Sequence, residues 1–328
     1  MRQWKIFDSS GEHKIHSSFT PSMGGLSIFL GAVLTMGMGL SLEDWINLKY
    51  FFIALALMFI IGLRDDILAL SAKQKLYSQF LPLLVLVFLD RTILQSTYGV
   101  GGEFVFPEVV SMGLTIFVLL ILTNAYNLID GLDGLAGTIG GMILVCLGVW
   151  FFEIGNMPLA LVSFTFSGSL LAFLYFNWQP SKIFMGDTGA LMIGLLISYL
   201  TIKFINVNYA LPDGHTFKFN SSVGTAICLL IIPIFDTSRV IIVRLRKFQS
   251  PFKADKNHVH HQFIGLGFTH AQSVLFIATI GIFFISIAVL LRKQPDWLII
   301  SIALAGCVSI NYVLKHAQWK RIKHGTEN

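Results

Sequence analysis

The stretch VVSMGLTIFVLLILTNAY, residues 109–126, decides the class of fold, because it runs for 18 positions without a charged side chain. A helix needs about 20 apolar residues to cross the hydrocarbon core of a bilayer. Directly after this stretch the chain becomes polar, with Asn127, Asp130 and Asp133 spaced three residues apart. The stretch therefore predicts a transmembrane helix that ends in a group of polar side chains at the membrane boundary.

Nine further segments are similar in length and apolar content. With the first they make ten: about 23–41, 50–64, 77–94, 109–126, 134–152, 157–176, 188–206, 222–243, 271–291 and 296–314. Charged residues are only 12% of the 328 residues, whereas a soluble domain has about 25%. We predict an all-α, polytopic membrane helix bundle of about ten transmembrane helices, because lipid tolerates open sheets and bare loops poorly. No polar linker divides the chain, so residues 1–328 are expected to form one integral membrane domain.

The lysine and arginine residues predict the orientation of this bundle. With the N-terminus in the cytoplasm, 16 of them fall on the cytoplasmic face and six on the other, with Arg239 inside a helix. Such an excess is typical of cytoplasmic loops. The cytoplasmic parts then include residues 1–22, the loop 244–270 and the tail 315–328. We expect a multi-pass protein of the inner or plasma membrane with its active site on the cytoplasmic face. Nucleic-acid binding has little support, because no basic run alternates with aromatic residues.

Acidic and amide side chains gather in three of the predicted cytoplasmic connections. A helix cap explains one such residue easily. Three clusters on one face favour a site for a divalent cation, since Mg²⁺ binds carboxylates and substrate phosphates. The residues concerned are Asp65, Asp66, Asn127, Asp130, Asp133, Asn177 and Asp187.

The fourth cytoplasmic connection carries cationic and imidazole side chains. Arg244 precedes it, and His258, His260 and His261 lie within four residues of one another. A zinc site usually needs further ligands at a fixed spacing, which this segment lacks. Guanidinium and imidazole groups suit a diphosphate, and a polar loop that faces water is the alternative.

These residue types together predict a class of reaction. Phosphoryl transfer needs mainly positioning and charge neutralisation from the protein, and a site at the mouth of a membrane bundle suits one water-soluble and one lipid substrate. We therefore predict a metal-dependent transferase that uses a phosphorylated lipid. A transporter is the alternative from another class, since transporters place ionisable groups near the middle of the membrane. The predicted helices are nearly free of such groups apart from Asp236 and Arg239.

Five motifs in this order resemble the polyprenyl-phosphate N-acetylhexosamine-1-phosphate transferases, the glycosyltransferase 4 family. The resemblance runs from about residue 12 to about residue 265. The motifs are Thr20-Pro-Ser-Met-Gly-Gly25, Asp65-Asp66 with its downstream lysines, Asn124-Ala-Tyr-Asn-Leu-Ile-Asp-Gly-Leu-Asp-Gly134, Phe184-Met-Gly-Asp-Thr-Gly189 and His258-Val-His-His261.

The resemblance implies an activity. It implies Mg²⁺-dependent transfer of N-acetylglucosamine-1-phosphate from UDP-GlcNAc to undecaprenyl phosphate, with release of UMP, at the start of cell-envelope glycan synthesis. Mn²⁺ is an alternative ion. The His-x-His-His pattern is similar to that of enzymes that accept UDP-GlcNAc. The Thr20–Gly25 motif is more similar to the branch that transfers phospho-MurNAc-pentapeptide, so other UDP-N-acetylhexosamines stay open. The oligomeric state is open too, with a homodimer as one option.

The resemblance also implies a role for each site residue. Asp187 would hold Mg²⁺, and Asp65 would deprotonate or position the lipid phosphate beside Asp66. The nucleotide pocket would be lined by Asn127, Asp130, Asp133 and Asn177, with Phe184 stacked on uracil. Phosphates would be neutralised by Lys75 and Arg244, and the sugar phosphate would lie near His258, His260 and His261.

Two departures and one competing resemblance accompany these motifs. Many GlcNAc-type relatives have a further helix before the His16-Ser17 segment, and this chain starts without it. We therefore expect either a form with ten helices or a start that is internal to the natural chain. Ala69 stands where an extended acidic motif has a third Asp. Asp130-Gly-Leu-Asp-Gly134 also begins like the motif of CDP-alcohol phosphotransferases, but Gly137-Thr138 stands where that motif has Ala-Arg.

Overall fold

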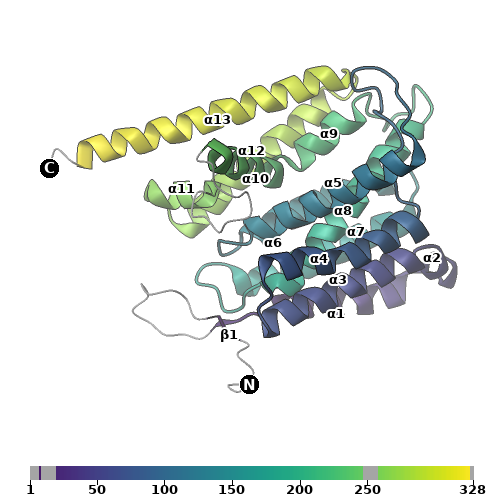
Figure 1. Ribbon diagram of the computed structural model, residues 1–328, viewed down its shortest axis with the longest axis horizontal. Coiled ribbons are helices and arrows are strands. Elements are labelled where there is room, and N and C mark those ends of the chain that lie inside the picture. The colour runs from purple at the N-terminus through teal and green to yellow at the C-terminus, as the bar shows by residue number, and fades with distance from the viewer. Residues whose placement is uncertain (1–6, 9–19, 247–257, 326–328) are drawn as a thin grey trace. The chain divides into compact units, whose positions relative to one another are not determined.

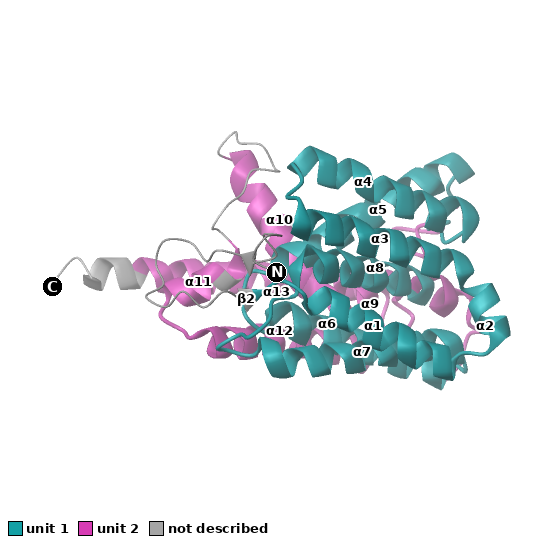
Figure 2. Ribbon diagram, turned by 90° about the horizontal axis from the view of Figure 1, so that it is seen from below, with its two compact units in different colours: residues 1–95, 106–204 teal, residues 96–105, 205–328 magenta. Residues whose placement is uncertain are grey.

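The computed structural model describes residues 7–8, 20–246 and 258–325, and it is almost entirely helical (Figure 1). The chain forms two compact units, which Figure 2 shows in different colours. The first consists of Met1–Gln95 and Phe106–Phe204, and the second of Ser96–Val105 and Ile205–Asn328. The expectation of one integral membrane domain stays a prediction.

The first unit contains the first eight α-helices of the chain. They are α1 (Gly24–Gly39), α2 (Leu42–Asn47), α3 (Lys49–Ile67), α4 (Ala72–Leu84), α5 (Glu108–Ile129), α6 (Leu135–Glu153), α7 (Met157–Asn177) and the larger part of α8 (Gly186–Ala210). A short π-helix, η2 (Val85–Leu89), continues α4. Two short strands, β1 (Phe7–Asp8) and β2 (Thr20–Pro21), pair antiparallel. Figure 1 shows α1, α3 and α4 running side by side.

Helix α8 is the central helix of the first unit. Phe51 of α3 stacks on Tyr199 of α8, with ring centroids 4.4 Å apart. At the start of α8, Gly25 of α1 packs against Gly189 so closely that a Cβ on Gly25 would lie 2.2 Å from the Gly189 nitrogen. Small residues at such contacts allow helix backbones to approach closely in membrane bundles. Gly25 and Gly189 therefore fix the first turn of α8 against α1.

The outer surface of the first unit is apolar as well as its interior. In α1, Leu34 is 70% exposed and Met38 is 92% exposed, and Leu171 of α7 is 61% exposed. Soluble proteins rarely expose large contiguous apolar areas. Together with the long apolar helices, this surface identifies a multi-pass membrane protein.

Six helices are long and apolar enough to cross a membrane within the described part of the chain. They are α5, α6, α7, α8, α12 (His270–Leu290) and, as far as Trp319, α13 (Asp296–Gly325), and a bent pair of helices raises the number to seven. The all-α membrane fold is thus confirmed, but the expected count of about ten is not. Two of the ten segments show why: α1 has only 16 residues, and α3 ends in the charged residues Arg64, Asp65 and Asp66.

The second unit contains α9 (Ser222–Leu229), α10 (Ile231–Arg246), α11 (Val259–Gly265), α12 and α13. The segment 222–243 was expected to be one helix, and this expectation was wrong. Helices α9 and α10 meet at an angle of 78°. Pro233 accounts for the break, because it has no amide hydrogen to donate to the Leu229 carbonyl four residues before it, and its ring would clash with that carbonyl in a continuous helix. Asp296, at the start of α13, accepts a hydrogen bond from the Gly224 amide at 2.6 Å and so ties α13 to α9.

Candidate functional site

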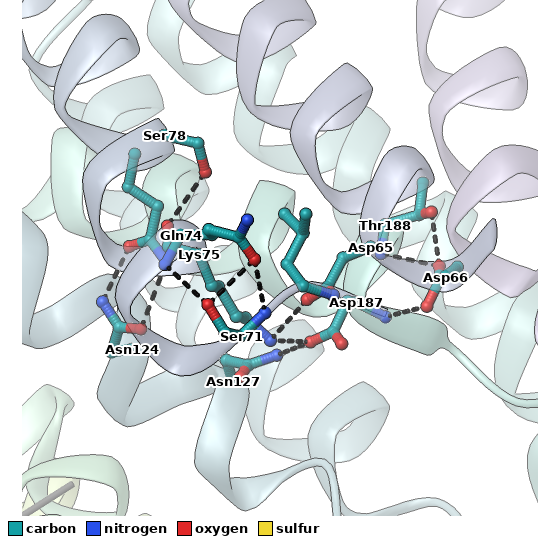
Figure 3. Close-up of polar contacts among 12 residues, drawn as sticks. Asp65, Asp66, Ser71, Gln74, Lys75, Ser78, Asn124, Asn127, Asp187 and Thr188 are labelled. Atoms are coloured by element: carbon teal, nitrogen blue, oxygen red, sulfur yellow. Dashed lines mark hydrogen bonds and ion pairs between the residues drawn. The ribbon is translucent and has the colours of Figure 1, made fainter. Parts of the chain in front are cut away.

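Asp187, in the first turn of α8, is the point at which several predicted site residues of the first unit meet (Figure 3). Its Oδ1 accepts a hydrogen bond from Lys75 Nζ and another from Asn127 Nδ2, the latter at 2.7 Å. Lys75 Nζ also lies 3.2 Å from Asp65 Oδ2. The four side chains come from α8, α4, α5 and α3. The fold therefore brings two carboxylates, an amide and an ammonium group into one cluster.

Asp65 shapes the turn that presents Lys75. Its side chain is only 6% exposed, and its Oδ1 accepts a hydrogen bond from the Leu70 amide at 2.7 Å. Ser71 and Gln74 then start α4 with a reciprocal capping box, a strong local signal for a helix start. Lys75 follows in the first turn of α4, facing Asp65. Burial raises the pKa of the Asp65 carboxyl above its usual value, against the opposing effect of the Leu70 amide and Lys75.

Asp66 faces the start of α8. Its Oδ1 accepts the Asp187 amide at 2.7 Å, and its Oδ2 accepts the Thr188 amide at 2.9 Å and the Thr188 hydroxyl at 2.5 Å. The first amides of a helix have no partner inside the helix, so Asp66 caps α8 from α3. Gly186 makes room for this contact, because it has φ +70° and a Cβ there would lie 2.6 Å from Asp66 Oδ2. Asp66 thus fixes the backbone that carries Asp187.

Asp130 and Asp133 add negative charge near the cluster. Asp130 follows the last residue of α5, and Asp133 lies in the turn before α6. Burial, and then the charges of Asp187, Asp66 and Asp133, raise the pKa of Asp130 well above its usual value. An excess of carboxylates in a partly buried place is stabilised by a cation, and Lys75 supplies one positive charge there.

Asn177 and Phe184 hold the loops around the site. The Asn177 side chain, in a residue only 4% exposed, accepts the Gly134 amide at 2.8 Å and donates to the Ile183 carbonyl at 2.8 Å. It therefore joins the turn after Asp133 to the loop before α8. The Phe184 carbonyl accepts the Gly24 amide at 2.9 Å, which joins the same loop to α1. The predicted roles of Asn177 and Phe184 in binding a nucleotide stay predictions.

Arg244 and the three histidines belong to the second unit. His258 is buried, and its Nδ1 lies 2.9 Å from Asp236 Oδ2. Arg244 is buried too, and His261 is exposed. The side chain of His260 and residues 247–257 lie outside the described residues. That the histidines join the carboxylate cluster stays a prediction.

Sequence reasoning assigned no role to two buried polar residues. Asp236 of α10 is 2% exposed and also accepts the Val259 amide at 2.6 Å; the signal was an ionisable residue inside an apolar helix. Gln79 of α4 is fully buried and exchanges hydrogen bonds with Asn124 of α5. No local pattern marks Gln79, because its partner is 45 residues away.

The donor set around Asp187 fits Mg²⁺ bound together with a phosphorylated substrate. Mg²⁺ usually takes one or two carboxylates, and substrate phosphates and water complete its coordination. Asp187 suits this role because its side chain is 32% exposed. No group of three or more His, Cys, Asp or Glu side chains that could hold a metal ion occurs in the described residues.

Known sequences resemble the chain over most of its length. The profile of "Glycosyl transferase family 4" matches residues 48–205, from the last residue before α3 into α8. A Bacillus subtilis (strain 168) protein named "Probable undecaprenyl-phosphate N-acetylglucosaminyl 1-phosphate transferase" is 32% identical over 299 residues, which cover 89% of this chain and 78% of the relative. "Decaprenyl-phosphate N-acetylglucosaminephosphotransferase" of Mycolicibacterium smegmatis is 30% identical over 289 residues, 81% and 70% of the two chains. "Undecaprenyl-phosphate alpha-N-acetylglucosaminyl 1-phosphate transferase" of Escherichia coli (strain K12) is 27% identical over 327 residues, 96% and 85%.

Proposed function

The chain belongs to glycosyl transferase family 4 and is a membrane transferase, and we propose that it moves N-acetylglucosamine-1-phosphate from UDP-GlcNAc to undecaprenyl phosphate and releases UMP. The reaction takes place at the cytoplasmic face of the inner or plasma membrane. The names of the relatives support the lipid acceptor and the sugar. The excess of lysine and arginine in the predicted cytoplasmic connections supports the orientation.

The observation that carries the proposal is the cluster around Asp187. Lys75 and Asn127 both donate to Asp187 Oδ1, and the Lys75 ammonium group also lies 3.2 Å from Asp65 Oδ2. Such a cluster offers carboxylate oxygens to a hard cation and N–H donors to phosphate oxygens. Phosphoryl transfer relies on these groups, because the protein acts mainly by positioning and by neutralising charge.

Asp187 is the proposed ligand of Mg²⁺, or of Mn²⁺ in its place. The ion, when bound, neutralises the diphosphate and withdraws charge from the phosphorus that is attacked. Asp66 supports this role of Asp187 indirectly, because both its oxygens accept hydrogen bonds from the first turn of α8. We therefore assign Asp66 to the positioning of Asp187 and not to proton transfer.

In the proposed step, an oxygen of the lipid phosphate attacks the phosphorus that bears the sugar. A new P–O bond forms there, the P–O bond to UMP breaks, and UMP leaves with that electron pair. A phosphate monoester has a second pKa of about 6 and is mostly a dianion at neutral pH. Asp65, whose pKa is raised by burial, accepts the remaining proton from the monoanionic fraction. Lys75 neutralises the oxygens of the approaching phosphates.

A transfer assay tests the proposal. Purified enzyme is incubated with labelled UDP-GlcNAc, undecaprenyl phosphate and Mg²⁺, and lipid-linked sugar and UMP are quantified. We expect both products in equal amounts, their loss on chelation, and their return with Mg²⁺ or Mn²⁺. Asp187→Asn should reduce the rate by at least about 10²-fold, while Asp213→Asn, at a fully exposed residue, should not.

The same assay separates the two donor classes that the sequence left open. UDP-MurNAc-pentapeptide is offered alone and as a competitor of UDP-GlcNAc. The proposal would be overturned if UDP-MurNAc-pentapeptide gave product and UDP-GlcNAc did not. It would also be overturned if the Asp187→Asn variant kept the transfer rate of the unmodified enzyme.

A further inference from the structure

Gln79 and Asn124 form a reciprocal pair of amides between α4 and α5. Asn124 Nδ2 donates to Gln79 Oε1 at 2.7 Å, and Gln79 Nε2 donates to Asn124 Oδ1 at 3.3 Å. Asn124 Nδ2 also donates to the Leu120 carbonyl of its own helix at 2.7 Å, which fixes the rotamer of Asn124. Gln79 is fully buried. Its side chain is therefore held in one place by a partner on another helix.

The amide pair lies one helical turn from the cluster around Asp187. Residues three or four apart share a face of a helix. On α4, Gln79 is four residues after Lys75, and on α5, Asn124 is three residues before Asn127. Figure 3 shows Asn124 to one side of Lys75 and Asp187 to the other. Lys75 and Asn127 meet at a single atom, Asp187 Oδ1.

This convergence requires a defined register between α4 and α5. Apolar side chains alone specify such a register weakly, because sliding one helix replaces one apolar contact with another. Hydrogen bonds between helices are directional and are satisfied at one register only. The neighbouring turns of α4 carry exposed Tyr77 and Leu81, which add no directional contact to α5.

We propose that Gln79 and Asn124, the amide clamp, set the position of α4 against α5 and so hold Lys75 and Asn127 on Asp187. Gln79 is then a positioning residue of the transferase, acting through Lys75. The inference rests on the proposed function only for its effect on catalysis. Its effect on the position of Lys75 is independent of the reaction.

Lys75 can be observed directly. Its side chain is 19% exposed and ion-paired with two carboxylates, whereas Lys73 on the same turn is exposed. An amine-labelling reagent, read by mass spectrometry, therefore gives a Lys75-to-Lys73 ratio that reports how firmly Lys75 is held. The full chain is labelled in detergent or lipid, without substrate. We expect Gln79→Leu, which keeps the side-chain volume but loses the amide, to raise this ratio several-fold.

Thr115→Val is the matched control on α5. The Thr115 hydroxyl is fully buried and accepts the Leu94 amide at 2.8 Å, so its loss also removes a buried contact between segments, at the other end of the helix. We expect Thr115→Val to lower thermal stability as much as Gln79→Leu does, without changing the labelling ratio. In the transfer assay, Gln79→Leu should lower kcat on the order of 10²-fold, as expected for displaced catalytic groups, and Thr115→Val should not.

An exchange of the two side chains tests whether the pair itself matters. Gln79→Asn and Asn124→Gln should each raise the labelling ratio, and the double variant should restore it, because one methylene moves from one side of the pair to the other. An unchanged ratio in Gln79→Leu, or a double variant as defective as the single ones, would overturn the clamp. Absence of lipid-linked product from the unmodified enzyme would overturn the proposed function and leave the labelling test of the clamp intact.

Discussion

Gly25→Ala adds a single methyl group where α1 and α8 are closest. The new Cβ would lie 2.2 Å from the Gly189 nitrogen and 2.7 Å from the Gly189 Cα. An ordinary contact begins at 3.4 Å, so the distance to the nitrogen is about 1.2 Å too short. Both atoms belong to the backbone of α8, so no rotamer change relieves the overlap. The first turn of α8 must move away from α1 by about that distance. The Gly25 amide would then lose its hydrogen bond to the Met185 carbonyl, now 2.9 Å long.

The displacement acts on stability and on activity. Overpacking in a well-packed interior costs about 1–3 kcal/mol, and a backbone overlap belongs at the upper end of that range. Because Asp187 lies on the displaced turn, transfer should fall on the order of 10²-fold, the effect of a 1 Å misplacement. The measurements are thermal unfolding of the purified protein and the rate of formation of lipid-linked sugar.

Gly37→Ala, on the same helix, is the control. A Cβ on Gly37 meets nothing within 4 Å, and alanine is better than glycine inside a helix by about 0.5–1 kcal/mol. This variant should be as stable as the unmodified protein or slightly more so, with unchanged transfer. If Gly25→Ala matched Gly37→Ala in both melting temperature and transfer rate, the close approach of α1 and α8 would not be what positions Asp187.

Three further predictions concern carboxylates that are buried or partly buried. Asp66→Ala leaves three donors at the start of α8 without their acceptor and should lower the free energy of unfolding by about 2 kcal/mol or more. Asp66→Asn keeps one acceptor oxygen, so its free energy of unfolding should fall less. Equal losses for the two variants in thermal unfolding would contradict the capping role. Asp236→Ala removes the acceptor of the Val259 amide and the partner of His258 and should cost about 1–3 kcal/mol, whereas Asp213→Ala at an exposed loop residue should leave the melting temperature unchanged. Asp130 has a pKa raised by burial and by neighbouring carboxylates, so its ionisation disfavours folding, and stability is lost as pH rises through the folded-state pKa. Asp130→Asn should therefore raise the melting temperature of the substrate-free protein more at pH 8 than at pH 5, and a gain that is larger at pH 5 would refute this.

The sequence predicted the helices well because apolar runs and polar connections alternate sharply along the chain. The residues 109–126 lie inside α5, and Asp65, Asn127 and Asp187 stand at helix ends, where the change in polarity marks them. The break between α9 and α10 was missed, although Pro233 gave a local signal for it. The expected count of about ten spans is not confirmed within the described residues, because α1 is short and α3 ends in charged residues, although both contain apolar runs.

The candidate site was predicted as a set of residues but not as an arrangement. Residue types at a membrane boundary pointed to Asp65 and Asp187, and the family resemblance added Lys75. Nothing local distinguishes Asp66, which caps α8, from Asp65, which contacts Lys75, since the two are adjacent in sequence and differ only in the direction that the helix gives them. Gln79 was missed for a similar reason: its pairing depends on α5, and long-range pairs leave no trace in a single sequence.

The cap that Asp66 provides has a consequence for how a diphosphate is bound. The start of a helix carries a partial positive charge and unpaired amides, and many proteins use it to bind phosphate. Here the amides of Asp187 and Thr188 already donate hydrogen bonds to the Asp66 carboxylate. The negative charge of Asp66 therefore compensates the dipole of α8 before any nucleotide binds. In the proposed reaction, an incoming pyrophosphate would then draw its counter-charge from full cations, from Lys75 and a divalent ion, and we expect its affinity to fall as ionic strength rises.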